Sequence, residues 1–99
     1  MRKRDFYNKA IKAWGNSFLY DMMIEESAEL IHALQHFKRR QEGSFTKVLS
    51  EVADLDILIE QFKITLLNQI WEYKTIKSRK IKRAIKRLNG TGVLNMAEK

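Results

Sequence analysis

The fold is decided by residues 16–40, which read NSFLYDMMIEESAELIHALQHFKRR. Apolar side chains return every three or four residues in this stretch, which is the spacing of one face of an α-helix. Asn16 is a favourable N-cap, so we predict a long amphipathic helix from about Asn16 to about Arg40. Its apolar stripe consists of Leu19, Met22, Met23, Leu30, Ala33, Leu34 and Phe37.

The neighbouring segments have the same helical pattern. Residues 5–14 predict a short helix that Gly15 ends. After the helix-breaking run Gln41-Glu42-Gly43, either Ser44 or Thr46 is a suitable cap for a third helix. The apolar stripe of that helix consists of Val48, Val52, Leu55, Ile59, Phe62 and Leu66.

The last helix is basic and is expected at about residues 70–89, before a loose tail at residues 90–99. The chain has no proline and only four glycines, so it lacks the turn formers that strand-rich folds need. We predict an all-α antiparallel helical bundle of about four helices. Residues 1–99 would be one domain, with an ordered core at about residues 5–89.

Composition limits the classes of function. The 99 residues include no cysteine, which excludes a disulfide scaffold, a Cys-ligated zinc site and a thiol nucleophile. Polar residues follow the basic start where a signal peptide needs an apolar stretch, and no run of about 18 apolar residues occurs. We therefore expect a cytoplasmic protein with no membrane partner. A core this small also favours oligomerisation.

Carboxylates lie on the apolar side of both central helices. Glu26 falls inside the apolar stripe of its helix, and Glu29 flanks the same face three residues later. On the next helix Glu51 lies beside the stripe, and Asp54 follows three residues later. Carboxylates that face a low-dielectric interior repel one another unless a cation neutralises them. Oxygen ligands of this kind suit Mg²⁺ or Mn²⁺.

A simpler interpretation exists for acidic side chains on helices. Most of them are solvated, as we expect for Glu25, Glu42, Asp56 and Glu60. The core-leaning carboxylates would then form ion pairs with Lys or Arg in a purely structural bundle. Two carboxylate pairs on consecutive helices, each intruding on an apolar stripe, favour the metal site over this alternative.

Taken together, Glu25-Glu26-Ser27-Ala28-Glu29 and, after 21 intervening residues, Glu51-Val52-Ala53-Asp54 resemble the E-E-x-x-E and E-x-x-D motifs of the MazG-like nucleoside triphosphate pyrophosphohydrolases. The flanking Ala13-Trp14-Gly15 and the basic last helix are similar to the short single-domain members. The resemblance spans roughly residues 10–88. It implies hydrolysis of a nucleoside triphosphate to a monophosphate and pyrophosphate, by an all-α homodimer or homotetramer.

The resemblance also implies roles for individual residues. Glu26, Glu29, Glu51 and Asp54 would bind Mg²⁺, or alternatively Mn²⁺. Glu25 would assist catalysis with Glu26 and Glu51 by orienting or activating water. The substrate-binding residues implied are Lys77, Lys80, Arg83 and Trp14. An aromatic side chain near a helix end, such as Trp14, is more often part of the core than a base-stacking residue.

The basic helix offers a different class of function. Between Glu72 and Asn89 there are eight Lys or Arg and one acid, whereas the rest of the chain has 11 of each. This segment therefore carries the whole net charge of +7. The alternative to the enzyme is a small basic helical protein that binds the phosphate backbone of a nucleic acid through this helix.

Overall fold

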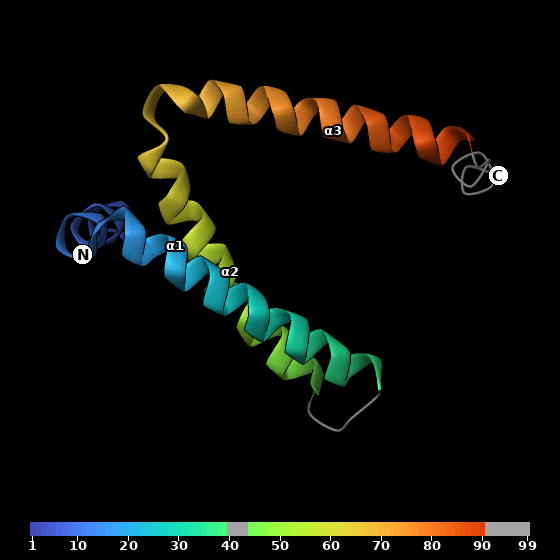
Figure 1. Cartoon of the computed structure of the whole chain (residues 1–99), viewed down its shortest axis with the longest axis horizontal. Helices are drawn as coiled ribbons and strands as arrows, with labels where there is room; N and C mark the ends of the chain where they lie inside the picture. Colours follow the sequence, from blue (N-terminus) through green and yellow to red (C-terminus); the bar gives the residue numbers. More distant parts are fainter. Residues whose placement is uncertain (40–43, 91–99) are drawn as a thin grey trace. The chain divides into compact units, whose positions relative to one another are not determined.

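The computed structural model describes residues 1–39 and 44–90. It contains helix α1 (Lys3–Lys38), helix α2 (Ser44–Thr65), a short 3₁₀ turn η1 (Leu67–Gln69) and helix α3 (Ile70–Gly90), shown in Figure 1. No strand occurs within these ranges, so the predicted all-α class is confirmed.

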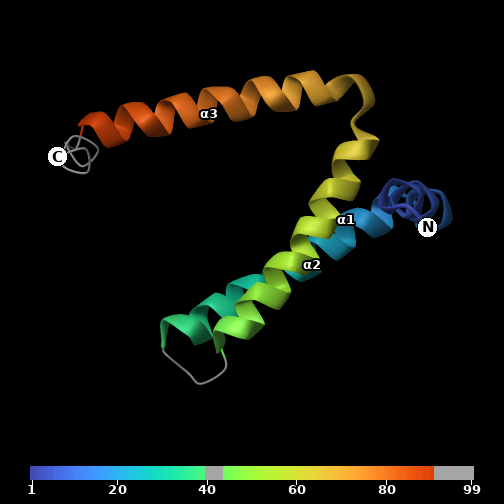
Figure 2. The same cartoon turned by 180° about the vertical axis from the view of Figure 1, so that it is seen from behind.

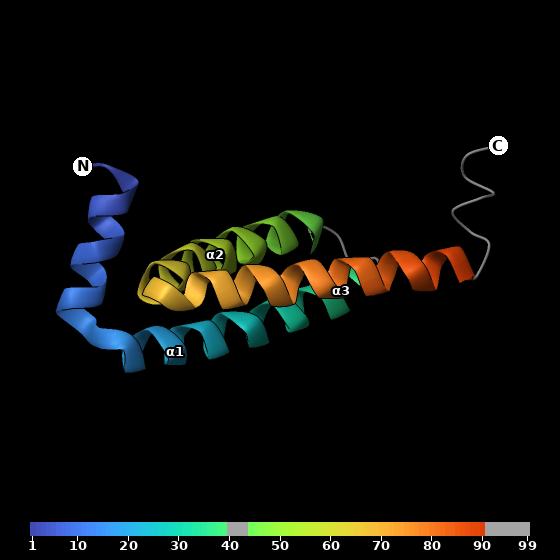
Figure 3. The same cartoon turned by 90° about the horizontal axis from the view of Figure 1, so that it is seen from above.

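The break predicted at Gly15 is present as a kink within α1. Gly15 has φ 81° and ψ 169°, and it is the one residue inside α1 whose backbone is not helical. That conformation is essentially restricted to glycine, because a Cβ atom would be strained there. The segments predicted as two separate helices are therefore one bent element, as Figure 3 shows, and the described residues form three α-helices where about four were predicted.

Helices α1 and α2 form an antiparallel hairpin, which Figures 1 and 2 show from opposite sides. Leu19 and Ala33 of α1 and Val48 of α2 are buried between them. The kink directs the first part of α1 toward the end of α2, where the Tyr7 hydroxyl donates a hydrogen bond of 2.6 Å to Glu60. Lys3 adds an ion pair of 3.1 Å to the same carboxylate. The expectation that Glu60 is simply solvated was therefore wrong.

The buried part of the hairpin is narrower than the predicted apolar stripes. Leu34, Phe37 and Val52 belong to those stripes, yet all three are exposed in the structure. The reason is geometric, because one neighbouring helix covers only part of an apolar face. Exposed apolar side chains continue along both helices: Tyr20, Ile24, Ile31 and Leu34 on α1, and Phe45, Leu49 and Val52 on α2.

The chain divides into two compact units, Met1–Leu66 and Leu67–Lys99, which we describe separately. Helix α3 belongs to the second unit, and all of its side chains except Ile70 and Tyr73 are exposed. It ends at Gly90, close to the predicted end. The predicted break at Gln41-Glu42-Gly43 and the tail after Gly90 lie outside the described residues. The prediction of a single domain over residues 1–99 stays a prediction.

Within residues 1–39 and 44–90, none of the helices combines the length and the apolar character that crossing a membrane requires.

Candidate metal centre

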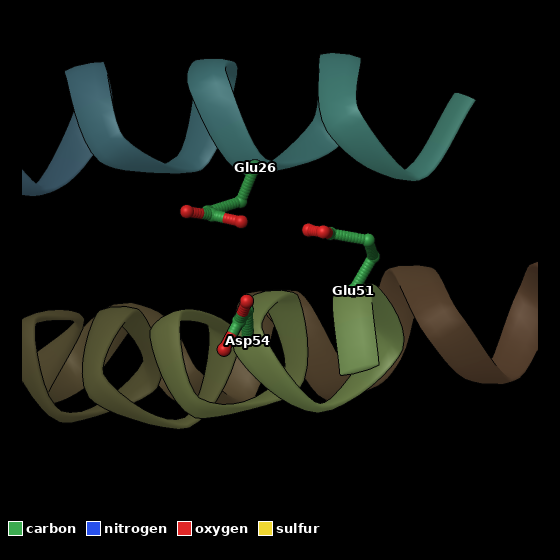
Figure 4. A group of neighbouring side chains, drawn as sticks. All are labelled: Glu26, Glu51 and Asp54. Carbon is green, nitrogen blue, oxygen red and sulfur yellow. The ribbon is translucent and has the colours of Figure 1, made fainter. Parts of the chain in front are cut away.

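Three of the four predicted ligand side chains meet inside the hairpin. Glu26 extends from α1 toward α2, and Glu51 and Asp54 extend from α2 toward α1, as Figure 4 shows. One carboxylate oxygen from each residue lies within 4.8 Å of those of the other two. The antiparallel packing of α1 against α2 is what brings Glu26 to Glu51 and Asp54, which lie 25 and 28 positions later in the sequence.

This cluster is unusual because one of its carboxylate side chains is almost fully buried. The Glu51 side chain is only 2% exposed, Glu26 is partly buried, and Asp54 is exposed. Glu51 is buried because it lies among the residues of the α2 stripe that face α1, one turn from Val48 and Leu55. The Oε2 atoms of Glu26 and Glu51 are buried and have no hydrogen-bond partner among the described residues. Buried polar atoms without partners are costly and uncommon in native proteins.

The electrostatics of the cluster reflect this crowding. Burial raises the pKa of Glu26, and the charges of Glu29 and Asp54 raise it further. The pKa of Glu51 is lowered, because its ion pair with Lys47 outweighs the effect of burial. Neighbouring carboxylates with pKa values displaced in opposite directions are typical of functional sites, although structural ion-pair networks produce such shifts as well.

The remaining acidic residues of the motif lie at the edge of this cluster. Glu29 is exposed and is not one of the three residues whose oxygens meet. Three residues after Glu26, its side chain is rotated about 60° around the α1 axis. It still interacts with Glu51 of α2, and this interaction contributes to the lowered pKa of Glu51. Glu29 acts on the cluster through its charge, which raises the pKa of Glu26. Glu25 is exposed, and its predicted part in catalysis stays a prediction.

Three of the four predicted substrate-binding residues lie in a different compact unit from the carboxylates, and the fourth, Trp14, lies in the same unit. Lys77, Lys80 and Arg83 are exposed on α3, in the second compact unit. Trp14 lies beside the kink, 57% exposed, with its ring 5.4 Å from that of Phe18. The expectation that Trp14 belongs to the core was therefore wrong, and substrate contacts for these four residues stay predictions.

Sequence reasoning missed Lys47, whose ammonium nitrogen lies 2.7 Å from Glu51 Oε1. The two residues are four positions apart on α2. That spacing does bring side chains together on a helix, but such pairs are so common that it did not single out Lys47.

A scan against protein-family models, a search of curated proteins and a search of solved structures find no match to this chain.

Proposed function

We propose that this protein is a divalent-metal-dependent hydrolase that cleaves nucleoside triphosphates to nucleoside monophosphate and pyrophosphate. The observation that carries the proposal is the meeting of Glu26, Glu51 and Asp54, with two buried carboxylate oxygens that lack hydrogen-bond partners among the described residues. The choice of substrate rests on the resemblance of the two acidic motifs to the MazG-like enzymes.

The donor set fits a hard divalent cation. All three side chains offer only oxygen atoms, which are the ligands of Mg²⁺ and Mn²⁺, whereas softer metals favour nitrogen or sulfur. A cation would also supply the charge that the buried oxygens lack. Glu26, Glu51 and Asp54 would bind it, and Glu29 is the further ligand that the resemblance implies.

The division between buried and exposed carboxylates suits this chemistry. When bound, the cation would neutralise phosphate charge and favour attack by water on the phosphorus. Glu51 is rigidly placed by its burial, whereas Asp54 faces solvent, from which a triphosphate would approach. The exposed Glu25 would orient the attacking water and accept its proton, as the resemblance implies.

We further propose that the protein is a homodimer or homotetramer. Seven of the exposed apolar side chains form two stripes, which consist of Tyr20, Ile24, Ile31 and Leu34 on α1 and of Phe45, Leu49 and Val52 on α2. At about 100° per residue, antiparallel packing puts both stripes on the same side of the hairpin, opposite Glu29 and Asp54. An exposed apolar surface of this kind is typical of an interaction site, and self-association would cover it without covering Glu29 and Asp54.

The experiment is pyrophosphate release from a panel of nucleoside and deoxynucleoside triphosphates, with Mg²⁺, with Mn²⁺ and with a chelator. We expect metal-dependent release by the wild type and none by Glu51→Ala. Glu60→Ala is the matched control, because it removes another interhelical carboxylate that has its own partners. Absence of release from every nucleotide by the wild type would contradict the proposal.

The second candidate is nucleic-acid binding by α3. It is favoured by the exposure of Lys74, Lys77, Arg79, Lys80, Lys82, Arg83, Lys86 and Arg87, all on this one helix. This function leaves the carboxylates of the hairpin without a purpose. Salt-sensitive retention of DNA or RNA, together with no metal-dependent turnover, would favour it over the hydrolase.

A further inference from the structure

At the candidate metal centre, an ion pair of 2.7 Å joins Lys47 to Glu51. We infer that Lys47 is a built-in counter-ion of this centre, whose ammonium group competes with the divalent cation for Glu51. The inference rests on the metal centre of the proposed function. It adds that one residue of the chain, Lys47, lowers the affinity of that centre for a divalent cation.

The two partners differ strongly in exposure. The Glu51 side chain is 2% exposed, whereas that of Lys47 is 62% exposed. Glu51 is therefore confined to the interior, while the flexible stem of Lys47 allows its ammonium group to move into solvent without moving α2. The pair can open on the lysine side alone, which is what exchange of one cation for another requires.

Lys47 interacts with more than one carboxylate. Its hydrogen bond to Glu51 raises the pKa of Lys47 most, and the charges of Glu29 and Asp54 contribute in the same direction. The ammonium group thus lies in the field of the same carboxylates that would attract a metal ion. It supplies one positive charge to a cluster of three carboxylates, so it neutralises the cluster only in part.

The ammonium group and a divalent cation repel each other if both stay at Glu51. Two like charges a few ångströms apart interact strongly enough near a protein surface to change a binding constant by about tenfold or more. Metal binding must therefore either displace Lys47 or proceed against this repulsion. In both cases Lys47 lowers the affinity for the cation and stabilises the metal-free hairpin.

The test is Mn²⁺ binding, followed by electron paramagnetic resonance, together with thermal melting in a chelator. We expect Lys47→Met to bind Mn²⁺ about tenfold more tightly than the wild type and to melt at a lower temperature without metal. Lys3→Met is the matched control, because Lys3 forms an ion pair with Glu60 and not with the cluster. It should leave the Mn²⁺ affinity unchanged.

Lys47→Gln covers the case in which Lys47→Met does not fold. Glutamine removes the charge but retains a polar group for Glu51, and it should also tighten Mn²⁺ binding. Lys47→Arg retains the charge and should bind Mn²⁺ no more tightly than the wild type. Unchanged or weaker Mn²⁺ binding by both uncharged variants would overturn the role of Lys47 and leave the metal centre standing. Absence of Mn²⁺ binding by the wild type would overturn both.

Discussion

Two clusters lie along the same hairpin: one consists of Glu60 with Tyr7 and Lys3, and the other of Glu26, Glu51 and Asp54 with Lys47. They differ in how completely donors and positive charges offset the negative charge of the carboxylates. Glu60 accepts a hydrogen bond from Tyr7 and forms an ion pair with Lys3, so one carboxylate has two partners. Within residues 1–39 and 44–90, the cluster around Glu51 brings together three carboxylates, and the ammonium group of Lys47 forms an ion pair with one of them. Two of its buried oxygens have no partner among the described residues.

The comparison separates a structural carboxylate from a candidate functional one. The partners of Glu60 fasten the first part of α1 to α2, and they lower the pKa of Glu60. In the cluster around Glu51, burial and the surplus of negative charge raise the pKa of Glu26, so its charged form costs stability, and a metal ion would remove that cost. Substitutions at the two clusters should therefore have opposite effects on stability and activity.

The largest effect is expected from Glu51→Gln on turnover. Loss of a buried, charged ligand should lower the rate of pyrophosphate release by about a hundredfold or more, since a bound metal supplies several kcal/mol of transition-state stabilisation. Glu60→Gln should retain the wild-type rate at a temperature where it is folded. An equal loss of pyrophosphate release in both variants, or a wild-type rate in Glu51→Gln, would show that the two clusters do not differ in function.

The next effect concerns the kink that brings Tyr7 to Glu60. Gly15→Ala should lower the free energy of unfolding by about 1–3 kcal/mol, because alanine is strained at φ 81°. Apart from the adjoining residues and the nearby backbone of the helix itself, no heavy atom of the described residues lies within 4 Å of the added Cβ, so the cost comes from the backbone conformation. Urea unfolding measures this loss of stability. Mn²⁺ binding to the cluster of Glu26, Glu51 and Asp54 should persist. A neutral substitution would show that the helix does not need this conformation.

Glu26→Gln and Glu60→Gln should shift the melting temperature in a chelator in opposite directions. The pKa of Glu26 is raised by burial, so the folded state favours its protonated form and is destabilised as the pH rises through that pKa. Glutamine removes this loss and should raise the melting temperature at neutral pH. Glu60→Gln should lower it. Equal shifts of the same sign would remove the distinction between the clusters.

The smallest effect is expected from Tyr7→Phe, which should lower the free energy of unfolding by about 1 kcal/mol. The hydrogen bond to Glu60 and burial raise the pKa of Tyr7 from 10.0 to about 12. Because the folded-state pKa is the higher one, this contribution is complete below pH 10.0 and is lost as the pH rises to about 12. Measured across this pH range, the difference in free energy of unfolding between the wild type and Tyr7→Phe should shrink as the pH rises. A constant difference would rule out the hydrogen bond as its source.

The break at Gly15 was predicted from the glycine itself. Helical period predicted much of the rest of the hairpin. Together with the scarcity of turn formers it gave the all-α class, and it placed carboxylates on the apolar sides of two helices. It did not predict the exposure of Leu34 or Val52, because period identifies an apolar face but not how much of it a neighbour covers. Nor did it predict that Asp54, and not Glu29, joins Glu26 and Glu51, since that depends on the register between α1 and α2.

The sequence patterns also did not predict which distant segments contact each other. The contacts of Glu60 with Tyr7 and Lys3 depend on how the kink redirects α1, and no local pattern contains that information. The metal role of the cluster, the part played by Glu25, and phosphate binding by Lys77, Lys80 and Arg83 stay predictions.

We propose above all that the hairpin binds a divalent cation at Glu26, Glu51 and Asp54. The most direct measurement is a titration of the wild-type protein with Mn²⁺, with Mg²⁺ as competitor and Glu51→Gln as the comparison. We predict saturable Mn²⁺ binding that Mg²⁺ displaces and that Glu51→Gln lacks. Absence of saturable Mn²⁺ binding by the folded wild type, or equal binding by Glu51→Gln, would show that these three carboxylates are not the metal site.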